Sequence, residues 1–137
     1  MSIGYSVTPL VKKLGIKTGS RVLLINEPIH YFTLLGEIPM IERLSRDCNS
    51  HEVDFIHLFS SSQEELFPLL SEFKDRINQS GMIWVSWPKK ASKIMTDLSD
   101  EIIRKYALSI GLVDVKVCAV DEVWSGLKLV IPLKNRN

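Results

Sequence analysis

Small polar side chains follow two apolar runs of this chain, at positions where they could bind a polar ligand. Asn26 and Glu27 come directly after the run RVLLI, and Ser60, Ser61 and Ser62 follow the run VDFIHLF. A helix is expected to begin after the serines, and the free N–H groups at a helix start favour an anion. The same serines could instead cap that helix without a ligand, which is a common role for serine. We therefore keep a small anionic ligand as one hypothesis for these five residues.

A lysine-rich loop follows a third apolar run and offers further contacts for an anion. In the segment MIWVSWPKKASK the run breaks at Pro88, and three lysines follow within five residues. Lys89 and Lys90 could neutralise a phosphate or carboxylate, and Trp87 could form an aromatic wall beside it. The alternatives are a solvated loop for the lysines and a core position for the tryptophan.

The chain lacks the residue spacings of common catalytic and metal sites. It has no GxSxG elbow, no P-loop and no CxxC pair, and neither Cys48 nor Cys118 has a histidine at a recognisable spacing. His30, His51 and His57 do not have the spacing of metal ligands either. The sequence therefore predicts no metal site and no cofactor, it leaves the catalytic residues unknown, and it favours a buried strand position for His57.

Length and composition are those of one globular domain covering residues 1–137. The chain is 45% apolar and 24% charged, and its net charge is only +1. Basic residues are scattered rather than striped with aromatics, so no nucleic-acid partner is expected. No apolar run reaches the roughly eighteen residues of a membrane span, and the first residues do not resemble a signal peptide. These patterns predict no membrane contact and a cytoplasmic location.

Helical and strand-like patterns alternate along the chain, which is typical of an α/β protein with right-handed crossovers. The expected helices cover residues 8–15, 28–36, 62–77 and 97–110, and the expected strands cover residues 21–26, 40–45, 53–59, 82–87, 112–120 and 123–131. The last two strands should form an antiparallel hairpin. We expect the third and fourth helices to cover opposite faces of the sheet.

Two side-chain patterns make the strand predictions more specific. Val113, Val115 and Val117 alternate with charged residues, which predicts a regular strand with one apolar face. Trp84 and Trp87 are an odd number of residues apart, so they should point to opposite faces of their strand.

From residue 15 to residue 131 the order of elements resembles a shortened class I methyltransferase fold, the Rossmann-like fold that binds S-adenosylmethionine. LGIKTGSRVLLIN resembles the lead-in and first strand of that fold, and VDFIHLF, INQSGMIWVSW, GLVDVKVCAV and WSGLKLVI resemble its last four strands. One strand–helix unit is missing between residues 45 and 53. The resemblance implies a Rossmann-like three-layer sandwich with a mostly parallel six-stranded sheet, in the order 2-1-3-4-6-5 with the last strand antiparallel.

The loop after the first strand departs from that family. Its members have glycines there, because the backbone passes close to the cofactor, whereas this chain has Asn26, Glu27 and Pro28. Glu42 and Asp47 are the only acidic residues that could hold a ribose after the second strand. The loop therefore argues against the usual cofactor site.

A second resemblance covers nearly the whole chain. GYSVTPLVKKLGI, WVSWPKKAS, TDLSDEIIRKYAL and GLVDVKVCAVDEVWSGLKLV resemble the signature segments of a family of small bacterial proteins of unknown function. This implies a bacterial protein with no assigned activity, and it supplies no catalytic residue.

Three hypotheses follow from these observations. The leading one is a non-enzymatic binding or regulatory module for a small anionic ligand or a protein partner. The alternative is a methyltransferase-like transferase with atypical cofactor binding. The third is a homodimer that pairs through the C-terminal hairpin near Trp124.

Overall fold

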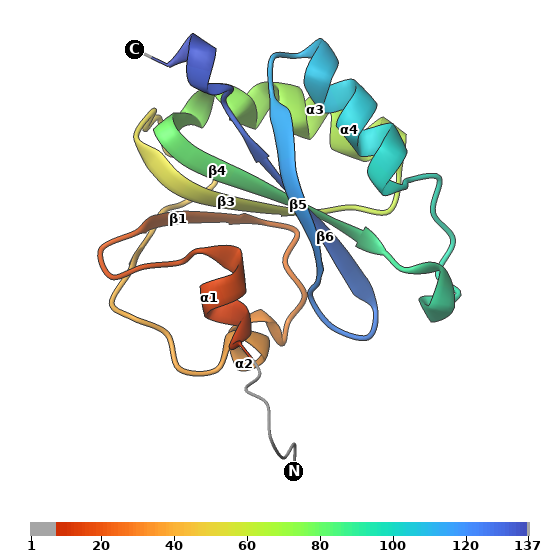
Figure 1. Ribbon diagram of the computed structural model, residues 1–137. Coiled ribbons are helices and arrows are strands. Elements are labelled where there is room, and N and C mark those ends of the chain that lie inside the picture. The colour runs from red at the N-terminus through yellow and green to blue at the C-terminus, as the bar shows by residue number, and fades with distance from the viewer. Residues whose placement is uncertain (1–7, 137) are drawn as a thin grey trace.

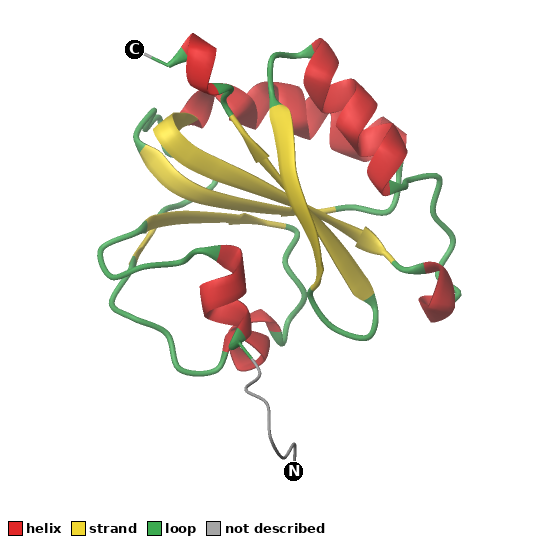
Figure 2. Ribbon diagram, viewed as in Figure 1, coloured by secondary structure: helices red, strands yellow, loops and turns green. Residues whose placement is uncertain are grey.

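Six strands form a single twisted sheet with helices on both faces (Figures 1 and 2). The computed structural model describes residues 8–136. Its strands are β1 (Arg21–Ile25), β2 (Glu42–Arg43), β3 (Val53–Phe59), β4 (Ile77–Pro88), β5 (Val113–Ala119) and β6 (Trp124–Val130). Residues 1–7 and 137 of the predicted domain, including the start of GYSVTPLVKKLGI, lie outside the described residues.

The strand order is β2-β1-β3-β4-β6-β5, as predicted. Pairing is parallel from β2 through β4, and β6 runs antiparallel to both β4 and β5. No helix or strand lies between β2 and β3, which agrees with the predicted absence of one strand–helix unit. The prediction of a Rossmann-like sheet with an antiparallel last strand is therefore confirmed.

The helices divide into two pairs. They are α1 (Leu10–Leu14), α2 (Tyr31–Leu35), α3 (Gln63–Phe73) and α4 (Asp100–Ser109), with short 3-10 turns η1 (Lys74–Arg76), η2 (Lys90–Ser92) and η3 (Leu133–Asn135). Figure 1 shows α1 and α2 on one side of the sheet and α3 and α4 on the other. Within residues 8–136 no helix is both long enough and apolar enough to span a bilayer.

The expectation that α3 and α4 cover opposite faces is wrong. The crossovers from β3 to β4 and from β4 to β5 both move along the sheet in the same direction. Because such crossovers are right-handed, each places its helix on the same face. The crossover from β1 to β2 moves the other way, so α2 lies on the opposite face.

Each face of the sheet has its own apolar layer. Trp87 packs in the layer under α3 and α4, and Trp84 packs in the layer under α1 and α2, which confirms that they point to opposite faces. The indole N–H of Trp84 donates to the carbonyl of Leu14 at 2.7 Å, so it also anchors the end of α1. Gly126 of β6 lies against this indole, because a Cβ there would be 3.1 Å from Trp84 Cε3.

Strand β4 is longer than the predicted strand 82–87. The 62–77 helix is replaced after Phe73 by the turn η1, and β4 begins at Ile77. Gly81 allows this extension, because a Cβ at that position would lie 2.8 Å from the carbonyl oxygen of Val53 on β3.

A bulge interrupts the regular alternation predicted for β5. The register passes from Asp114 opposite Leu129 to Lys116 opposite Lys128, so Val115 has no residue opposite it. As a result Asp114 pairs with Arg104 of α4 on one face, and Lys116 lies over Trp84 on the other. A bulge adds one residue to a strand and so reverses the facing of the residues that follow.

Candidate functional site

A pocket of about 410 Å³ opens beside the loop that joins β1 to α2. We call it the β1–α2 pocket, and its lining residues are Glu27, Pro28, Ile29, Tyr31, Phe32 and Arg43. It lies beyond the carboxyl end of β1, next to the point where the strand order reverses between β1 and β3. Open α/β sheets bind their ligands at this place.

Asn26 preserves the turn that a glycine would make after β1. Its φ is 58°, in the left-handed region that asparagine adopts more readily than most residues. Its side-chain Nδ2 donates to the carbonyl of Phe59 at 3.3 Å and so ties the end of β1 to the end of β3. The chain therefore turns as a glycine loop does, but an amide side chain occupies the space that a glycine would leave open.

The β1–α2 pocket contains one carboxylate and one guanidinium, which pair with each other. Glu27 forms an ion pair with Arg43 at the end of β2, and the Arg43 guanidinium also lies 5.3 Å from the centre of the Phe32 ring. The Glu27 side chain is 24% exposed and that of Arg43 50%, so a ligand could reach both.

Neither residue suggested as a ribose ligand lies in this pocket. Glu42 pairs at 3.7 Å with Arg21, which begins β1 at the amino end of the sheet. Asp47 accepts a hydrogen bond from Ser45 in an exposed turn, and this bond lowers the pKa of Asp47. Glu27 is therefore the carboxylate that the fold places beside the strand ends.

The loop that lines the pocket is tied to the β5–β6 hairpin. His30 Nε2 lies 3.2 Å from Asp121 Oδ2, and Asp121 Oδ1 accepts the backbone N–H groups of Val123 and Trp124 at 2.8 and 2.7 Å. Partial burial opposes ionisation of Asp121, but the hydrogen bonds from Trp124, His30 and Val123 together lower its pKa. An ionised Asp121 thus holds the hairpin turn and the pocket loop together.

The three candidate serines make contacts with the chain itself. Ser60 is buried and donates to Glu65 Oε1 at 2.6 Å. Ser62 caps α3 by accepting the N–H of Glu65. The carbonyl of Ser61 accepts the hydroxyl of Thr96 at 2.7 Å.

The start of α3 already holds a carboxylate. The backbone N–H of Gln63 donates to Asp97 Oδ1 at 2.8 Å, and its side-chain amide donates to the Asp97 carbonyl at the same distance. Asp97 therefore takes the position at the helix start where an external anion would bind.

Trp87, Lys89 and Lys90 lie at the end of β4, away from the β1–α2 pocket. The Trp87 side chain is only 7% exposed and belongs to the core under α3 and α4. The backbone N–H of Lys89 donates to the Val123 carbonyl at 2.7 Å, and Lys90 begins the exposed turn η2. Because β3 lies between β1 and β4, the fold does not bring these three residues together with Asn26 and Glu27.

A buried polar chain runs inward from the pocket wall. The Tyr31 hydroxyl lies 2.8 Å from His57 Nδ1, and His57 Nε2 lies 2.7 Å from Ser86 Oγ. His57 is fully buried and stacks on Phe59 with the ring centres 4.2 Å apart, as predicted for a strand histidine. Burial lowers the pKa of His57 to about 3. Burial, and secondarily Glu27, raises the pKa of Tyr31, so both groups are neutral at pH 7.

The sequence reasoning missed Tyr31, Phe32 and Arg43, and it also missed Ile29, an exposed residue that lines the pocket. The available signal for Tyr31 and Phe32 was an aromatic pair shortly after the first strand, in NEPIHYF. No signal pointed to Arg43, because it enters the pocket only through the parallel pairing of β2 with β1.

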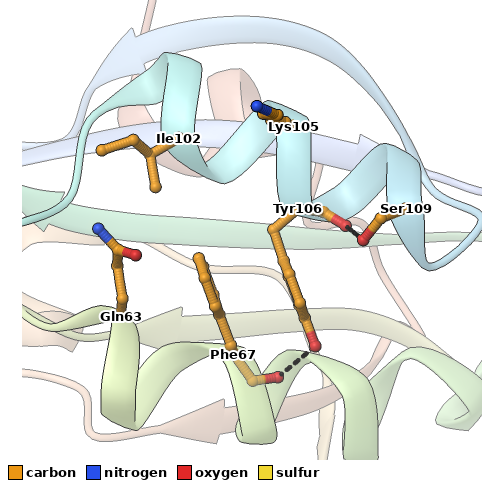
Figure 3. Close-up of a pocket in the computed structure, with 6 residues that line it drawn as sticks. All are labelled: Gln63, Phe67, Ile102, Lys105, Tyr106 and Ser109. Atoms are coloured by element: carbon orange, nitrogen blue, oxygen red, sulfur yellow. Dashed lines mark hydrogen bonds between the residues drawn. The ribbon is translucent and has the colours of Figure 1, made fainter.

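A second depression, of about 380 Å³, lies between α3 and α4 on the other face (Figure 3). Phe67 and Tyr106 stack across it with their ring centres 3.9 Å apart, and the Tyr106 hydroxyl donates to the Phe67 carbonyl at 3.1 Å. Lys105 and Gln63 lie at its margin. The polar groups do not converge as they do around the β1–α2 pocket, so we regard the latter as the candidate site.

No protein-family model matches the chain, and no curated protein matches it either. Solved structures do match. A SAM-dependent methyltransferase from Aquifex aeolicus has 17% sequence identity and a TM-score of 0.62, with 90% of this chain and 88% of that chain covered. Magnesium protoporphyrin IX methyltransferase from Synechocystis with bound SAM has 10% identity and a TM-score of 0.60, with coverages of 90% and 74%. A tRNA methyltransferase from B. subtilis has 11% identity and a TM-score of 0.58, with coverages of 93% and 67%.

These likenesses correct the leading hypothesis. The expectation of a non-enzymatic binding or regulatory module is contradicted, because the three similar structures described above are methyltransferases. They favour the methyltransferase-like alternative. The chain has the Rossmann-like fold of the class I methyltransferases.

Proposed function

We propose that this protein is a methyltransferase-like transferase that binds a nucleoside-containing cofactor in the β1–α2 pocket. The observation that supports the proposal best is the position of this pocket, beyond β1 and beside the reversal of strand order in a methyltransferase fold. One similar structure, the magnesium protoporphyrin IX methyltransferase, was solved with SAM bound.

The lining residues fit S-adenosylmethionine only in part. Glu27 is a partly exposed carboxylate that could accept hydrogen bonds from ribose hydroxyls, and Phe32 offers an aromatic edge or face to a base. Asn26 and Pro28 do not fit a cofactor that lies close to a glycine backbone. The Asn26 side chain fills the space that a glycine would leave for the cofactor, and Pro28 has no backbone N–H to donate to it. The cofactor would therefore lie against Glu27 and Phe32 rather than over the backbone of residue 26.

The pocket residues have binding and orienting roles in this proposal. When bound, S-adenosylmethionine would supply an electrophilic methyl group. Glu27 would exchange part of its contact with Arg43 for the ligand, and Arg43 would remain held over Phe32. The His30–Asp121 contact would keep the pocket loop in place during binding.

Isothermal titration and thermal unfolding with S-adenosylmethionine and S-adenosylhomocysteine test the proposal. A ligand at a hundredfold excess over its Kd stabilises by about 2.7 kcal/mol, which corresponds to a Tm increase of roughly 8 °C for a domain of this size. We expect Glu27→Gln to weaken the binding of S-adenosylmethionine about tenfold. The substitution removes the negative charge of the side chain that would accept hydrogen bonds from the ribose hydroxyls. Glu37→Gln, an exposed glutamate just after α2, is the matched control and should bind as the natural chain does.

A second variant tests the role of Asn26 in the same assay. Asn26→Gly keeps the left-handed turn, because glycine adopts positive φ freely, and removes the side chain that reaches Phe59. We expect it to bind S-adenosylmethionine more tightly. Absence of binding by both ligands to the natural chain and to Asn26→Gly would refute the proposal, as would equal loss of affinity in the Glu27 and Glu37 variants.

A further inference from the structure

Lysines from separate segments gather around Trp84 on the α1 side of the sheet. Lys116 of β5 and Lys128 of β6 are directly opposite each other in the antiparallel ladder, so their side chains share one face. Lys128 is also opposite Trp84 of β4, and the Lys116 ammonium lies 6.0 Å from the centre of the Trp84 ring. Trp84 in turn bonds to the Leu14 carbonyl at the end of α1, which brings the segment carrying Lys17 to the same place.

Electrostatic interactions connect these side chains with each other. Burial and the ammonium groups of Lys116 and Lys17 lower the pKa of Lys128. Burial raises the pKa of the Cys118 thiol, and the positive charges of Lys116 and Lys13 offset part of this increase. We call Lys13, Lys17, Lys116 and Lys128 the lysine patch.

The lysines of the patch are not paired with carboxylates in the described part of the chain. Asp54 lines a pocket together with Lys17, but its oxygens accept hydrogen bonds from the Arg21 backbone N–H and the Asn78 amide. Among residues 8–136, none of its four ammonium groups forms an ion pair within 4.0 Å. The other charged residue of β5, Asp114, faces away from the patch and pairs with Arg104 of α4 at 3.0 Å. A chain with a net charge of only +1 thus concentrates unpaired positive charge on one surface.

Protection of the sheet edge explains only part of this arrangement. Lysine on an edge strand discourages pairing with another chain, which would account for Lys116 on β5. It does not account for Lys128, because β6 is paired on both sides. It does not account for Lys13 and Lys17 either, because they belong to α1 and the turn after it.

We propose that the lysine patch is a docking surface for the phosphate backbone of a nucleic acid. Ammonium groups with no acidic partner bind phosphates and release condensed counterions, and such contacts position a chain without reading its bases. A bilayer surface is less suited, because the apolar residues Val11 and Leu14 of α1 are buried against the sheet instead of being exposed for insertion. The lysines are scattered along the sequence, and only the fold brings them together. This proposal is independent of the cofactor site.

Fluorescence anisotropy with a labelled single-stranded RNA and a duplex DNA of equal length tests this docking surface. If all four lysines contact phosphates, affinity for the duplex should fall about 150-fold between 50 and 200 mM salt, from a slope of about −0.9 per contact. The quadruple variant K13Q/K17Q/K116Q/K128Q should lose at least tenfold affinity at low salt and most of the salt dependence. The corresponding Lys→Arg quadruple variant should bind as the natural chain does.

The chain offers a control with an identical change of charge. R46Q/K74Q/K93Q/K105Q removes four positive charges outside the patch, from the turn after β2, from η1, from the residue after η2 and from α4. This variant should keep nucleic-acid binding and its salt dependence. If the patch variant fails to fold, K13Q/K17Q, which leaves the sheet intact, should still lose affinity. Equal losses in patch and control variants would overturn the proposal. Absence of binding to either nucleic acid, or binding only to phosphatidylserine vesicles, would also overturn it.

Discussion

The fully buried His57 should make the protein less stable as the pH falls below neutrality. Its two ring nitrogens bond to Tyr31 and Ser86, and burial lowers its pKa in the folded protein to about 3. In the unfolded chain the imidazole has its ordinary pKa of about 6.5. The unfolded state therefore binds a proton at a pH where the folded state does not.

The sign and size of the effect follow from proton linkage. The contribution of His57 to the free energy of unfolding is complete above the unfolded pKa, declines as the pH falls, and is lost near pH 3. Between pH 7.5 and 5.5 the two pKa values give a loss of about 1.4 kcal/mol from this residue alone. This window lies above the usual range of carboxylate pKa values, so histidines dominate the change.

Urea unfolding followed by tryptophan fluorescence can measure this loss. With a slope of roughly 2 kcal/mol per molar urea, the expected decrease in the unfolding midpoint is about 0.7 M between pH 7.5 and 5.5. His57→Gln removes the titrating group, so its midpoint should change much less over the same interval. His51→Gln, at an exposed position, is the control and should retain the decrease of the natural chain.

The comparison depends on the change with pH and not on the absolute stability of each variant. His57→Gln is expected to be less stable at every pH, because the buried partners Tyr31 and Ser86 lose their bonds. Equal pH-dependent losses in the natural chain and in His57→Gln would refute the reasoning. If the pH-dependent loss of stability disappeared in His51→Gln and remained in His57→Gln, its source would be His51 and not His57.

Two further substitutions test the packing and the helix start. Gly126→Ala should destabilise by about 1–3 kcal/mol in urea unfolding, because its Cβ would approach Trp84 and Val120 to 3.1 and 3.3 Å; an unchanged midpoint would contradict this packing. Asp97→Ala should cost about 1 kcal/mol by removing the carboxylate that accepts the Gln63 N–H, and a cost no larger than that of Glu101→Ala, an exposed residue within α4, would contradict this role.

The order of the elements could be predicted because apolar runs, capping residues and turns recur along the chain. VDFIHLF predicted the strand that the structure has as β3, and the helix expected from residue 62 is α3, with Ser62 as its N-cap. It was harder to predict which face of the sheet each helix covers, since that depends on the direction in which each crossover moves along the sheet. The bulge in β5 could not be predicted either, because Val113, Val115 and Val117 alternate regularly in the sequence. Local patterns thus identify elements, whereas the pairing of distant strands decides where side chains point.

The candidate site was predicted only at its centre. Asn26 and Glu27 lie at the end of β1 as expected, because any residue after a parallel strand must lie at that edge of the sheet. Arg43 joins Glu27 from another strand, and Asp97 fills the start of α3 from a loop beyond β4. These contacts join residues far apart in sequence, and no spacing rule predicts them.

The bonds of His57 also restrict how β3 and β4 can pair during folding. A slip of one residue would turn the apolar side chains of β3 to the wrong face, but a slip of two would keep every face unchanged. Apolar packing alone resists the second slip weakly, since Phe55, His57 and Phe59 are all bulky rings on one face. In the slipped arrangement His57 would be buried away from Ser86, with an unsatisfied ring nitrogen. The bond from His57 to Ser86, together with that from Asn78 to Asp54, thus favours one alignment of β3 with β4 over the slipped one.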